Sequence, residues 1–164
     1  VALDTCGLCQ PDVLSALAAE ADFILFDLKL YNSQDHERWT GVSNERILSN
    51  LELIKNIIKQ SAGSKKLWIR TPLIPKATDL NDNILSIGSF LAQQLNGTVD
   101  RWELCAFNNL CRDKYQRLDM QWVFSETPLM TESDLADIEK TAKNSSFDPQ
   151  RVYVTGATRV EHNN

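Results

Sequence analysis

Several short apolar runs in this chain stop at a charged residue, a pattern typical of buried parallel strands. In α/β barrels and open parallel sheets, reactive groups gather at the carboxyl ends of the strands, where loops can surround a ligand. We therefore expect the functional site at this edge of a sheet. The runs are residues 1–3 before Asp4, 23–26 before Asp27, and 67–69 before Arg70.

Segments with helical periodicity alternate with these runs. The clearest is a stretch in which Ile47, Leu51, Ile54 and Ile58 recur at helical spacing. Alternation of strand and helix at this spacing predicts right-handed βαβ crossovers and a parallel sheet of the α/β class. The expected strands are 1–3, 23–29, 67–73, 99–106 and 151–155, and the expected helices are 11–21, 34–40, 44–62, 80–95 and 132–143, with an irregular segment at 108–129.

Polar residues before the helices predict their N-terminal caps. Ser33 and Asp79 are expected to cap the helices that follow them. Thr131 and Asp134 resemble a capping box, with Asp in place of the usual Glu or Gln. His36, which lies in a polar helix, is expected at the surface, and Trp68, which has apolar neighbours, is expected in the core.

Asp27 and Lys29 are expected to point to the same face of the sheet. They are two positions apart in a predicted strand, and side chains alternate along a strand. A carboxylate and an ammonium then share one pocket. The alternative is that Asp27 and Lys29 form a solvated ion pair with no functional role, which would contribute about 0–1 kcal/mol to stability. Arg70 could likewise have only a structural role, by pairing with a carboxylate of a helix.

Composition narrows the class of protein. The chain has 164 residues, 43% of them hydrophobic, and a formal net charge of −5, which opposes a nucleic-acid partner. It has no signal peptide and no apolar run long enough for a membrane helix, so we expect a cytoplasmic protein. Because the sequence starts directly in an apolar strand, we expect it to be a piece of a longer protein.

The four cysteines indicate reduced thiols rather than a metal centre. Cys6 and Cys9 have the spacing of half a metal site, but a zinc ribbon needs a second close pair, and Cys105 and Cys111 have five residues between them. We therefore expect no metal bound by cysteines in this chain.

Short motifs at the predicted strand ends resemble those of the glycyl-radical-enzyme activating enzymes. These enzymes belong to the radical S-adenosylmethionine (SAM) superfamily, in the branch of the pyruvate formate-lyase activating enzyme. The motifs follow the family's order over most of residues 1–143. They are Asp4-Thr5-x-Gly7, Phe26-Asp27-Leu28-Lys29, Trp39-Thr40-Gly41-Val42-Ser43-Asn44, Trp68-Ile69-Arg70-x-Pro72-Leu73-Ile74-Pro75 and Lys114-Tyr115-x-x-Leu118.

The resemblance implies that part of the enzyme is missing from this chain. The family's Cys-x-x-x-Cys-x-x-Cys loop and its Gly-Gly-Glu segment do not occur here, so the ligands of the 4Fe-4S cluster are absent. We expect residues 1–164 to be a single fragment of a partial (β/α) radical-SAM barrel, about its C-terminal half to two-thirds, without the N-terminal strands. Such a fragment has no catalytic residue of its own, binds no cofactor by itself and is inactive alone.

The resemblance also implies roles for individual residues. Lys29 and Arg70 match positions that contact the carboxylate or ribose oxygens of SAM. Asn108 stands where the family often has a histidine near the adenosine. The resemblance also implies a site for Na⁺ or K⁺ beside the SAM carboxylate. Its ligands are Asp4, Thr5, Asp27 and the Leu25 carbonyl. Asp4 and Thr5 also match positions near the methionyl end of SAM.

The implied function is generation of a glycyl radical on a pyruvate formate-lyase-like partner, using SAM, a 4Fe-4S cluster and an electron donor such as flavodoxin or ferredoxin. One alternative is a (β/α)-barrel lyase or aldolase with Lys29 as the Schiff-base amine, although Asp27 alongside favours the ammonium form. A non-catalytic binding module is the other alternative. An incomplete barrel also exposes a sheet edge, so we expect self-association there.

Overall fold

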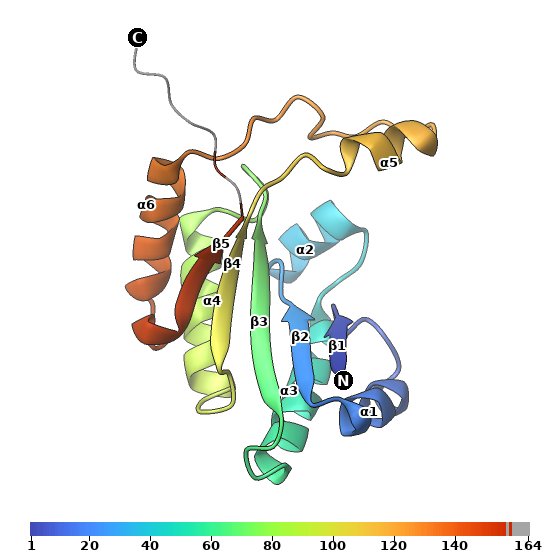
Figure 1. The fold of residues 1–164 in the computed structure, drawn as a ribbon, viewed down its shortest axis with the longest axis vertical. Coiled ribbons are helices and arrows are strands. Elements are labelled where there is room, and N and C mark those ends of the chain that lie inside the picture. The colour runs from blue at the N-terminus through green and yellow to red at the C-terminus, as the bar shows by residue number, and fades with distance from the viewer. Residues whose placement is uncertain (157, 159–164) are drawn as a thin grey trace.

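Five parallel strands form one sheet in the computed structural model, which describes residues 1–156 and 158. Their order across the sheet is their order along the chain (Figure 1), and the predicted α/β class is confirmed. The strands are β1 (Ala2–Thr5), β2 (Phe23–Asp27), β3 (Lys66–Leu73), β4 (Arg101–Ala106) and β5 (Val152–Thr155). The helices are α1 (Pro11–Glu20), α2 (Ser33–Thr40), α3 (Glu45–Gln60), α4 (Asn81–Gln94), α5 (Arg112–Arg117) and α6 (Glu132–Lys143), with a 3-10 turn, η1, at Pro149–Arg151.

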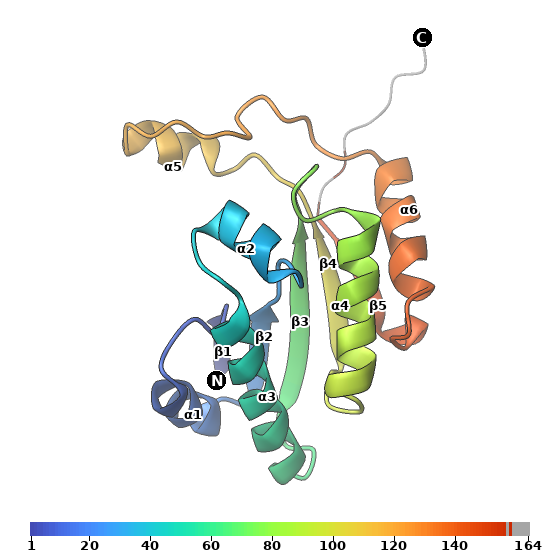
Figure 2. The same ribbon diagram turned by 180° about the vertical axis from the view of Figure 1, so that it is seen from behind.

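The main helices connecting the strands cover one face of the sheet. Helices α3 and α4 lie behind the strands in Figure 1 and in front of them in Figure 2, where the molecule is turned round. Helix α1 packs against α3, and α6 packs against α4 and β5. The sheet is therefore wound in one direction, as in a (β/α) barrel, and not doubly wound.

The helix-covered face supplies the hydrophobic core. Strand residues such as Phe26, Ile69 and Trp102 are fully buried there, and burying a side chain of this kind contributes about 1.5–3 kcal/mol. The Trp102 indole N–H donates to Thr71 Oγ1 at 3.0 Å, so the polar atom of this buried ring is also satisfied. The core thus fixes the position and register of the strands that carry the polar residues on the other face.

The opposite face, which we call the open face, has no helix crossing the strands in Figure 1. Phe23 and Trp68 meet edge-to-face there, with ring centroids 4.8 Å apart. The Arg101 guanidinium lies 4.3 Å from the ring centroids of both Trp68 and Tyr153, in contacts worth about 0.5–2 kcal/mol each. The prediction that Trp68 lies in the core is therefore wrong: β3 alternates, and Trp68 is half-buried on the open face.

The sequence predicts the position of α2 but not its cap. Asn32, and not Ser33, accepts hydrogen bonds from two backbone N–H groups of the first turn, at 2.9 and 3.1 Å. The prediction that His36 lies at the surface is wrong, because the side chain is buried. Its Nδ1 lies 2.8 Å from the Val42 carbonyl oxygen and 3.0 Å from Thr40 Oγ1. The turn that ends α2 therefore encloses the imidazole.

The other two predicted caps have opposite outcomes. Asp79 Oδ1 accepts the backbone N–H of Lys76 at 2.7 Å, and Leu80 occupies the N-cap of α4, so the predicted Asp79 cap is wrong. The capping box of α6 is confirmed, because Thr131 Oγ1 accepts the Asp134 N–H and the Asp134 carboxylate accepts the Thr131 N–H.

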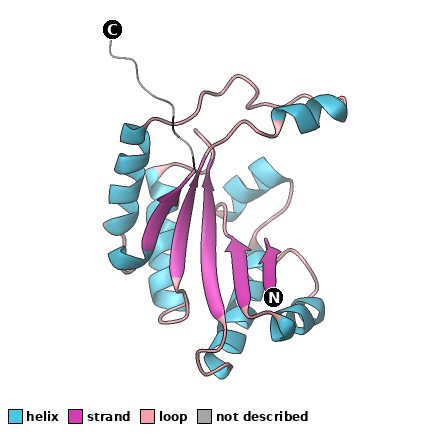
Figure 3. Ribbon diagram, viewed as in Figure 1, coloured by secondary structure: helices cyan, strands magenta, loops and turns pink. Residues whose placement is uncertain are grey.

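The segment between β4 and α6 is mostly loop, apart from α5 (Figure 3), and it extends beyond the carboxyl ends of the strands. Its aromatic rings pack on one another: Trp122 stacks on Tyr115 and Phe107, and Phe124 contacts Phe107 and Trp39. Over residues 1–156 and 158, no helix has the length and apolar character needed to cross a membrane.

Candidate functional site

Arg70 joins three neighbouring strands at the carboxyl edge of the sheet. Parallel pairing places Arg70 opposite Asp27, and both side chains lie on the open face. The Arg70 Nε donates to Asp27 Oδ1 at 2.9 Å, its Nη2 lies 2.8 Å from the same oxygen, and Nη2 also contacts Asp4 Oδ1. Residues that the sequence predicts to share this edge therefore form one hydrogen-bonded group.

Lys29 completes this group from just beyond β2. The strand ends at Asp27, two residues earlier than the sequence predicts, yet Lys29 Nζ still lies 3.3 Å from Asp27 Oδ2. Each oxygen of the Asp27 carboxylate thus contacts a different cation. The prediction that Asp27 and Lys29 lie together on one face is confirmed, and the two side chains form an ion pair. We call Asp4, Asp27, Lys29 and Arg70 the charged cluster.

The charged cluster is partly shielded from solvent and electrically balanced. The exposed fractions of the side chains are 23% for Arg70, 27% for Asp27 and 31% for Lys29, whereas Asp4 is more exposed at 59%. Burial alone would lower the pKa of Arg70, but the charges and hydrogen bonds of Asp27 and Asp4 raise it above its ordinary value. The guanidinium therefore stays charged at physiological pH.

The oxygens predicted to bind a monovalent cation already have other partners. Asp4 and Asp27 contact Arg70, and Thr5 Oγ1 accepts the Gly7 N–H at 3.0 Å. Leu25 lies within β2, paired with strands on both sides. A cation at this position would have to compete with Arg70 for the two carboxylates.

The loop between β1 and α1 is held in place by buried contacts. Asn50 of α3 donates from Nδ2 to the Gly7 and Cys9 carbonyl oxygens, at 2.7 and 2.9 Å. Gly7 has a φ of +71° and packs against Phe26, where a Cβ atom would approach the ring to 2.3 Å. Only glycine fits this position without displacement. The fixed loop holds Thr5 and Asp4 at the end of β1.

A pocket of about 440 Å³ opens beside the charged cluster, and it brings together Lys29, Asn108 and aromatic residues. Asn108 is exposed, and its Oδ1 accepts the Leu110 N–H at 3.2 Å, whereas its amide N–H₂ donates to no group of residues 1–156 and 158. Lys29 and Asn108, predicted from separate motifs, thus line the same cavity. Its aromatic wall consists of Trp39, Phe107, Tyr115, Trp122 and Phe124.

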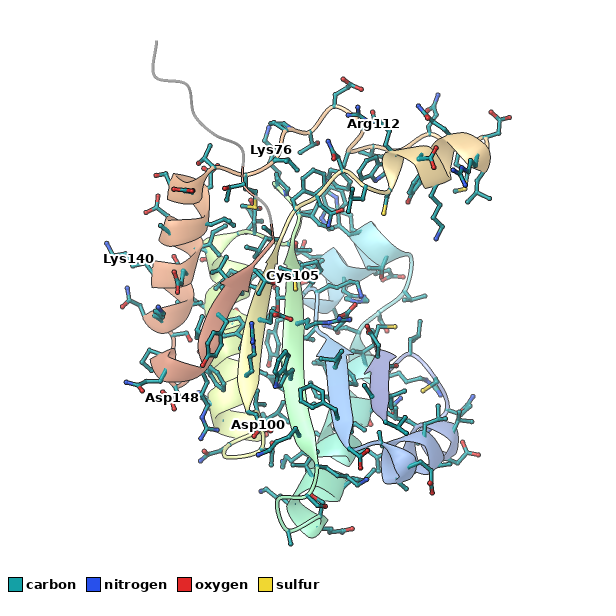
Figure 4. All side chains as sticks on the ribbon, in the orientation of Figure 1. Lys76, Asp100, Cys105, Arg112, Lys140 and Asp148 are labelled. Carbon is teal, nitrogen blue, oxygen red and sulfur yellow. The ribbon has the colours of Figure 1, made fainter. Side chains whose placement is uncertain are left out.

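The sequence reasoning did not assign Cys105 to this pocket. Its thiol lies on β4, between Pro72 and Thr155 on the neighbouring strands, and Figure 4 labels it near the carboxyl ends. Burial, with a smaller effect of Glu103, raises the pKa of this thiol, so it stays neutral at physiological pH. The sequence does contain a signal for the position of Cys105. Side chains alternate along a strand, so Arg101, Glu103 and Cys105 of β4 lie on the same face, which is the open face.

The described residues do not hold a metal cluster. All four cysteines are free, and over residues 1–156 and 158 no group of three or more His, Cys, Asp or Glu side chains is arranged to bind a metal ion. What the site can do is bind a ligand: two cations and two carboxylates suit a zwitterion, and the aromatic wall suits a planar ring.

Comparisons with known proteins identify relatives for most of the chain, although no family model matches it. The trans-4-hydroxy-L-proline dehydratase activating enzyme of Clostridioides difficile is 26% identical over 147 residues, which are 90% of this chain and 46% of that protein. The pyruvate formate-lyase-activating enzyme of Streptococcus mutans is 29% identical over 126 residues, 73% of this chain and 45% of that protein. The chain thus spans less than half the length of these relatives.

A solved structure shares the fold. The crystal structure of a domain of the pyruvate-formate lyase-activating enzyme from Bacteroides vulgatus superposes with a TM-score of 0.68, covering 94% of this chain and 80% of that one. The sequence identity is 20%, so this similarity speaks for the fold alone.

Proposed function

We propose, from the premise that this chain is related to the glycyl-radical-enzyme activating enzymes, that it forms the SAM-binding part of such an enzyme. The observation that carries the proposal is the convergence of the charged cluster and the aromatic pocket at one edge of the sheet. A methionyl group needs partners for both its carboxylate and its ammonium, and the cluster offers two charges of each sign.

In this proposal the chain binds and orients SAM. Lys29 and Arg70 hold its carboxylate or ribose oxygens, and Asn108 with the aromatic wall holds the adenosine. Bound SAM supplies a 5′-deoxyadenosyl radical when a reduced 4Fe-4S cluster cleaves it. Because the described residues do not fit a cluster, we propose that it is contributed from outside these 164 residues and that the chain alone is inactive.

The remaining parts of the proposal concern ions and partners. A Na⁺ or K⁺ ion would bind at Asp4, Thr5, Asp27 and the Leu25 carbonyl, where it competes with Arg70 for the carboxylates. Potassium should therefore raise the thermal midpoint of Arg70→Gln. It should raise the thermal midpoint of the wild type only slightly. The protein substrate is a pyruvate formate-lyase-like glycyl-radical enzyme, docked beside residues 108–129. Flavodoxin or ferredoxin supplies the electron.

SAM binding tests the proposal directly. We expect isothermal titration calorimetry to detect SAM binding by the full-length enzyme loaded with its cluster, and Arg70→Met to weaken this binding about tenfold, the effect of losing one charge-assisted hydrogen-bond pair. Lys66→Met is the matched control, because Lys66 is an exposed cation at the amino end of the same strand. Equal affinities in the wild type and Arg70→Met would contradict the proposed role of Arg70.

The alternative with Lys29 as a Schiff-base amine receives no support from the geometry. Lys29 donates to the Asp27 carboxylate, the arrangement of a paired ammonium and not of a free nucleophilic amine. Borohydride trapping of a carbonyl substrate on Lys29 would revive this alternative. A non-catalytic binding module would differ from the proposed enzyme in that the full-length protein, supplied with SAM, reductant and partner after cluster reconstitution, would yield no glycyl radical by electron paramagnetic resonance.

A further inference from the structure

A second cavity lies next to the candidate site and has a different character. It measures about 810 Å³, within the range of about 300–1,000 Å³ usual for ligand pockets, and it is bounded by α6, the β3–α4 connection and residues 123–130. We call it the acidic groove. Its apolar lining includes Val123, which is 84% exposed, together with the half-buried Phe124 and Leu129. Apolar groups exposed in a concavity favour a partner that covers them.

The charge of the groove is strongly one-sided. Four carboxylates line it, from Asp79, Glu126, Asp134 and Asp137, against one ammonium, from Lys76. Asp79 and Asp134 have structural roles as hydrogen-bond acceptors, but over residues 1–156 and 158 neither Glu126 nor Asp137 forms an ion pair. Burial, with a smaller contribution from the nearby Asp134 carboxylate, raises the pKa of Asp79.

The groove is continuous with the candidate site. Trp39 and Phe124 line both cavities, and their ring centroids lie 5.8 Å apart, so the two rings form a shared wall. A small ligand would fill one cavity or the other. An extended polypeptide seated in the groove would instead pass the shared wall and deliver its neighbouring residues to the charged cluster.

We propose that the acidic groove binds a segment of a protein partner in which lysine or arginine residues are interspersed with apolar ones. The charge excludes nucleic acids and anionic lipid surfaces, whose phosphates the carboxylates would repel. The apolar lining of the groove explains why apolar residues are expected between the basic ones in the bound segment. The inference rests on the proposed function only in taking this partner to be the protein substrate.

A peptide-binding measurement tests the groove. The probe is a short fluorescein-labelled peptide that alternates lysine and leucine, with a glutamate-for-lysine peptide as its negative counterpart. We expect fluorescence anisotropy to show binding of the lysine peptide and not of the glutamate peptide, and the double variant Glu126→Gln, Asp137→Asn to weaken binding about tenfold, because two exposed charge pairs are lost. Val123→Ser should weaken it further, because the leucines lose an apolar contact.

The matched control removes two carboxylates from α1 that are also exposed, with Asp12→Asn and Glu20→Gln. It makes the same change in net charge away from the groove, so we expect less than a twofold effect. If both double variants weaken binding equally, the attraction is non-specific and the proposal is overturned.

Two further outcomes are separable. If sedimentation shows that the groove variant abolishes self-association of this chain, the groove is an interface between copies, which also overturns the proposal. The peptide assay contains no SAM. Peptide binding that is lost only in the groove variant therefore supports the proposed peptide site, even if the protein does not bind SAM and the proposed function is wrong. SAM binding without peptide binding leaves the proposed function intact and refutes the groove.

Discussion

At the scale of single residues, the charged cluster owes its geometry to register and alternation. Arg70 faces Asp27 because β2 and β3 pair in parallel, and its long side chain spans to Asp4 on the next strand. The strand-end pattern in the sequence was sufficient to predict that these residues meet. It was not sufficient to predict which oxygen contacts which cation, because that depends on side-chain lengths and on the early end of β2.

Gly7 is the residue whose replacement we expect to be most revealing. In Gly7→Ala the methyl group clashes with Phe26 and the backbone keeps a positive φ, so we expect a loss of about 2–4 kcal/mol in the free energy of unfolding. Urea denaturation measures this loss. Gly41→Ala is the control, because Gly41 also has a positive φ but no atom near its Cβ position, and it should cost only about 1 kcal/mol. Equal losses would show that the Phe26 contact is unimportant.

Cys105 gives the fold a pH dependence with a defined sign. Its pKa in the folded state lies above the ordinary value of 9.0, so folding favours the neutral thiol. This stabilisation is fully present below pH 9.0 and is lost as the pH rises through the higher folded-state pKa. Thermal midpoints of the wild type should therefore fall more steeply in alkaline buffer than those of Cys105→Ser. Cys111→Ser, which changes an exposed thiol, should follow the wild type.

At the scale of elements, helix caps show where sequence reasoning succeeds and fails. The capping box of α6 was predictable because Thr131 and Asp134 have the spacing of the motif and directly precede a segment of helical periodicity. At α2, two adjacent residues, Asn32 and Ser33, are both good caps, and the path of the chain from β2 decides between them. Local propensity cannot make that choice.

The two candidate caps of α2 can be distinguished by substitution. We expect Asn32→Ala to cost about 1 kcal/mol, because two backbone N–H groups lose their acceptor. Ser33→Ala should be nearly neutral, since it lies in the first turn and alanine has the higher helix propensity. Chemical denaturation of both variants measures the difference, and the reverse order of the two effects would contradict the observed cap.

The segment between β4 and α6 was the least predictable element. Its irregular pattern indicated a loop with a short helix, which is confirmed by α5. The packing of Trp122 on Phe107 and Tyr115 had no periodic signal, because rings distant in sequence meet only after the chain has turned back over the sheet. The aromatic wall of the pocket was therefore found in the structure alone.

At the scale of the whole molecule, β1 is an edge strand of the sheet that residues 1–156 and 158 form. Parallel sheets usually have both faces and both edges covered. We expect the weight-average mass of the chain in analytical ultracentrifugation to rise with concentration. Ala2→Lys, which places a charge on the exposed edge strand, should reduce that rise. A constant monomer mass at high concentration would contradict self-association through this edge.

The order of the strands also has a consequence for biosynthesis. Each strand pairs with the strand that precedes it in the sequence, from β1 to β5. As the polypeptide emerges from the ribosome, the partner of every new strand has therefore already been made. The sheet can grow from the amino end by one strand and one helix at a time, and no strand within these residues has to wait, unpaired, for a partner that is translated much later.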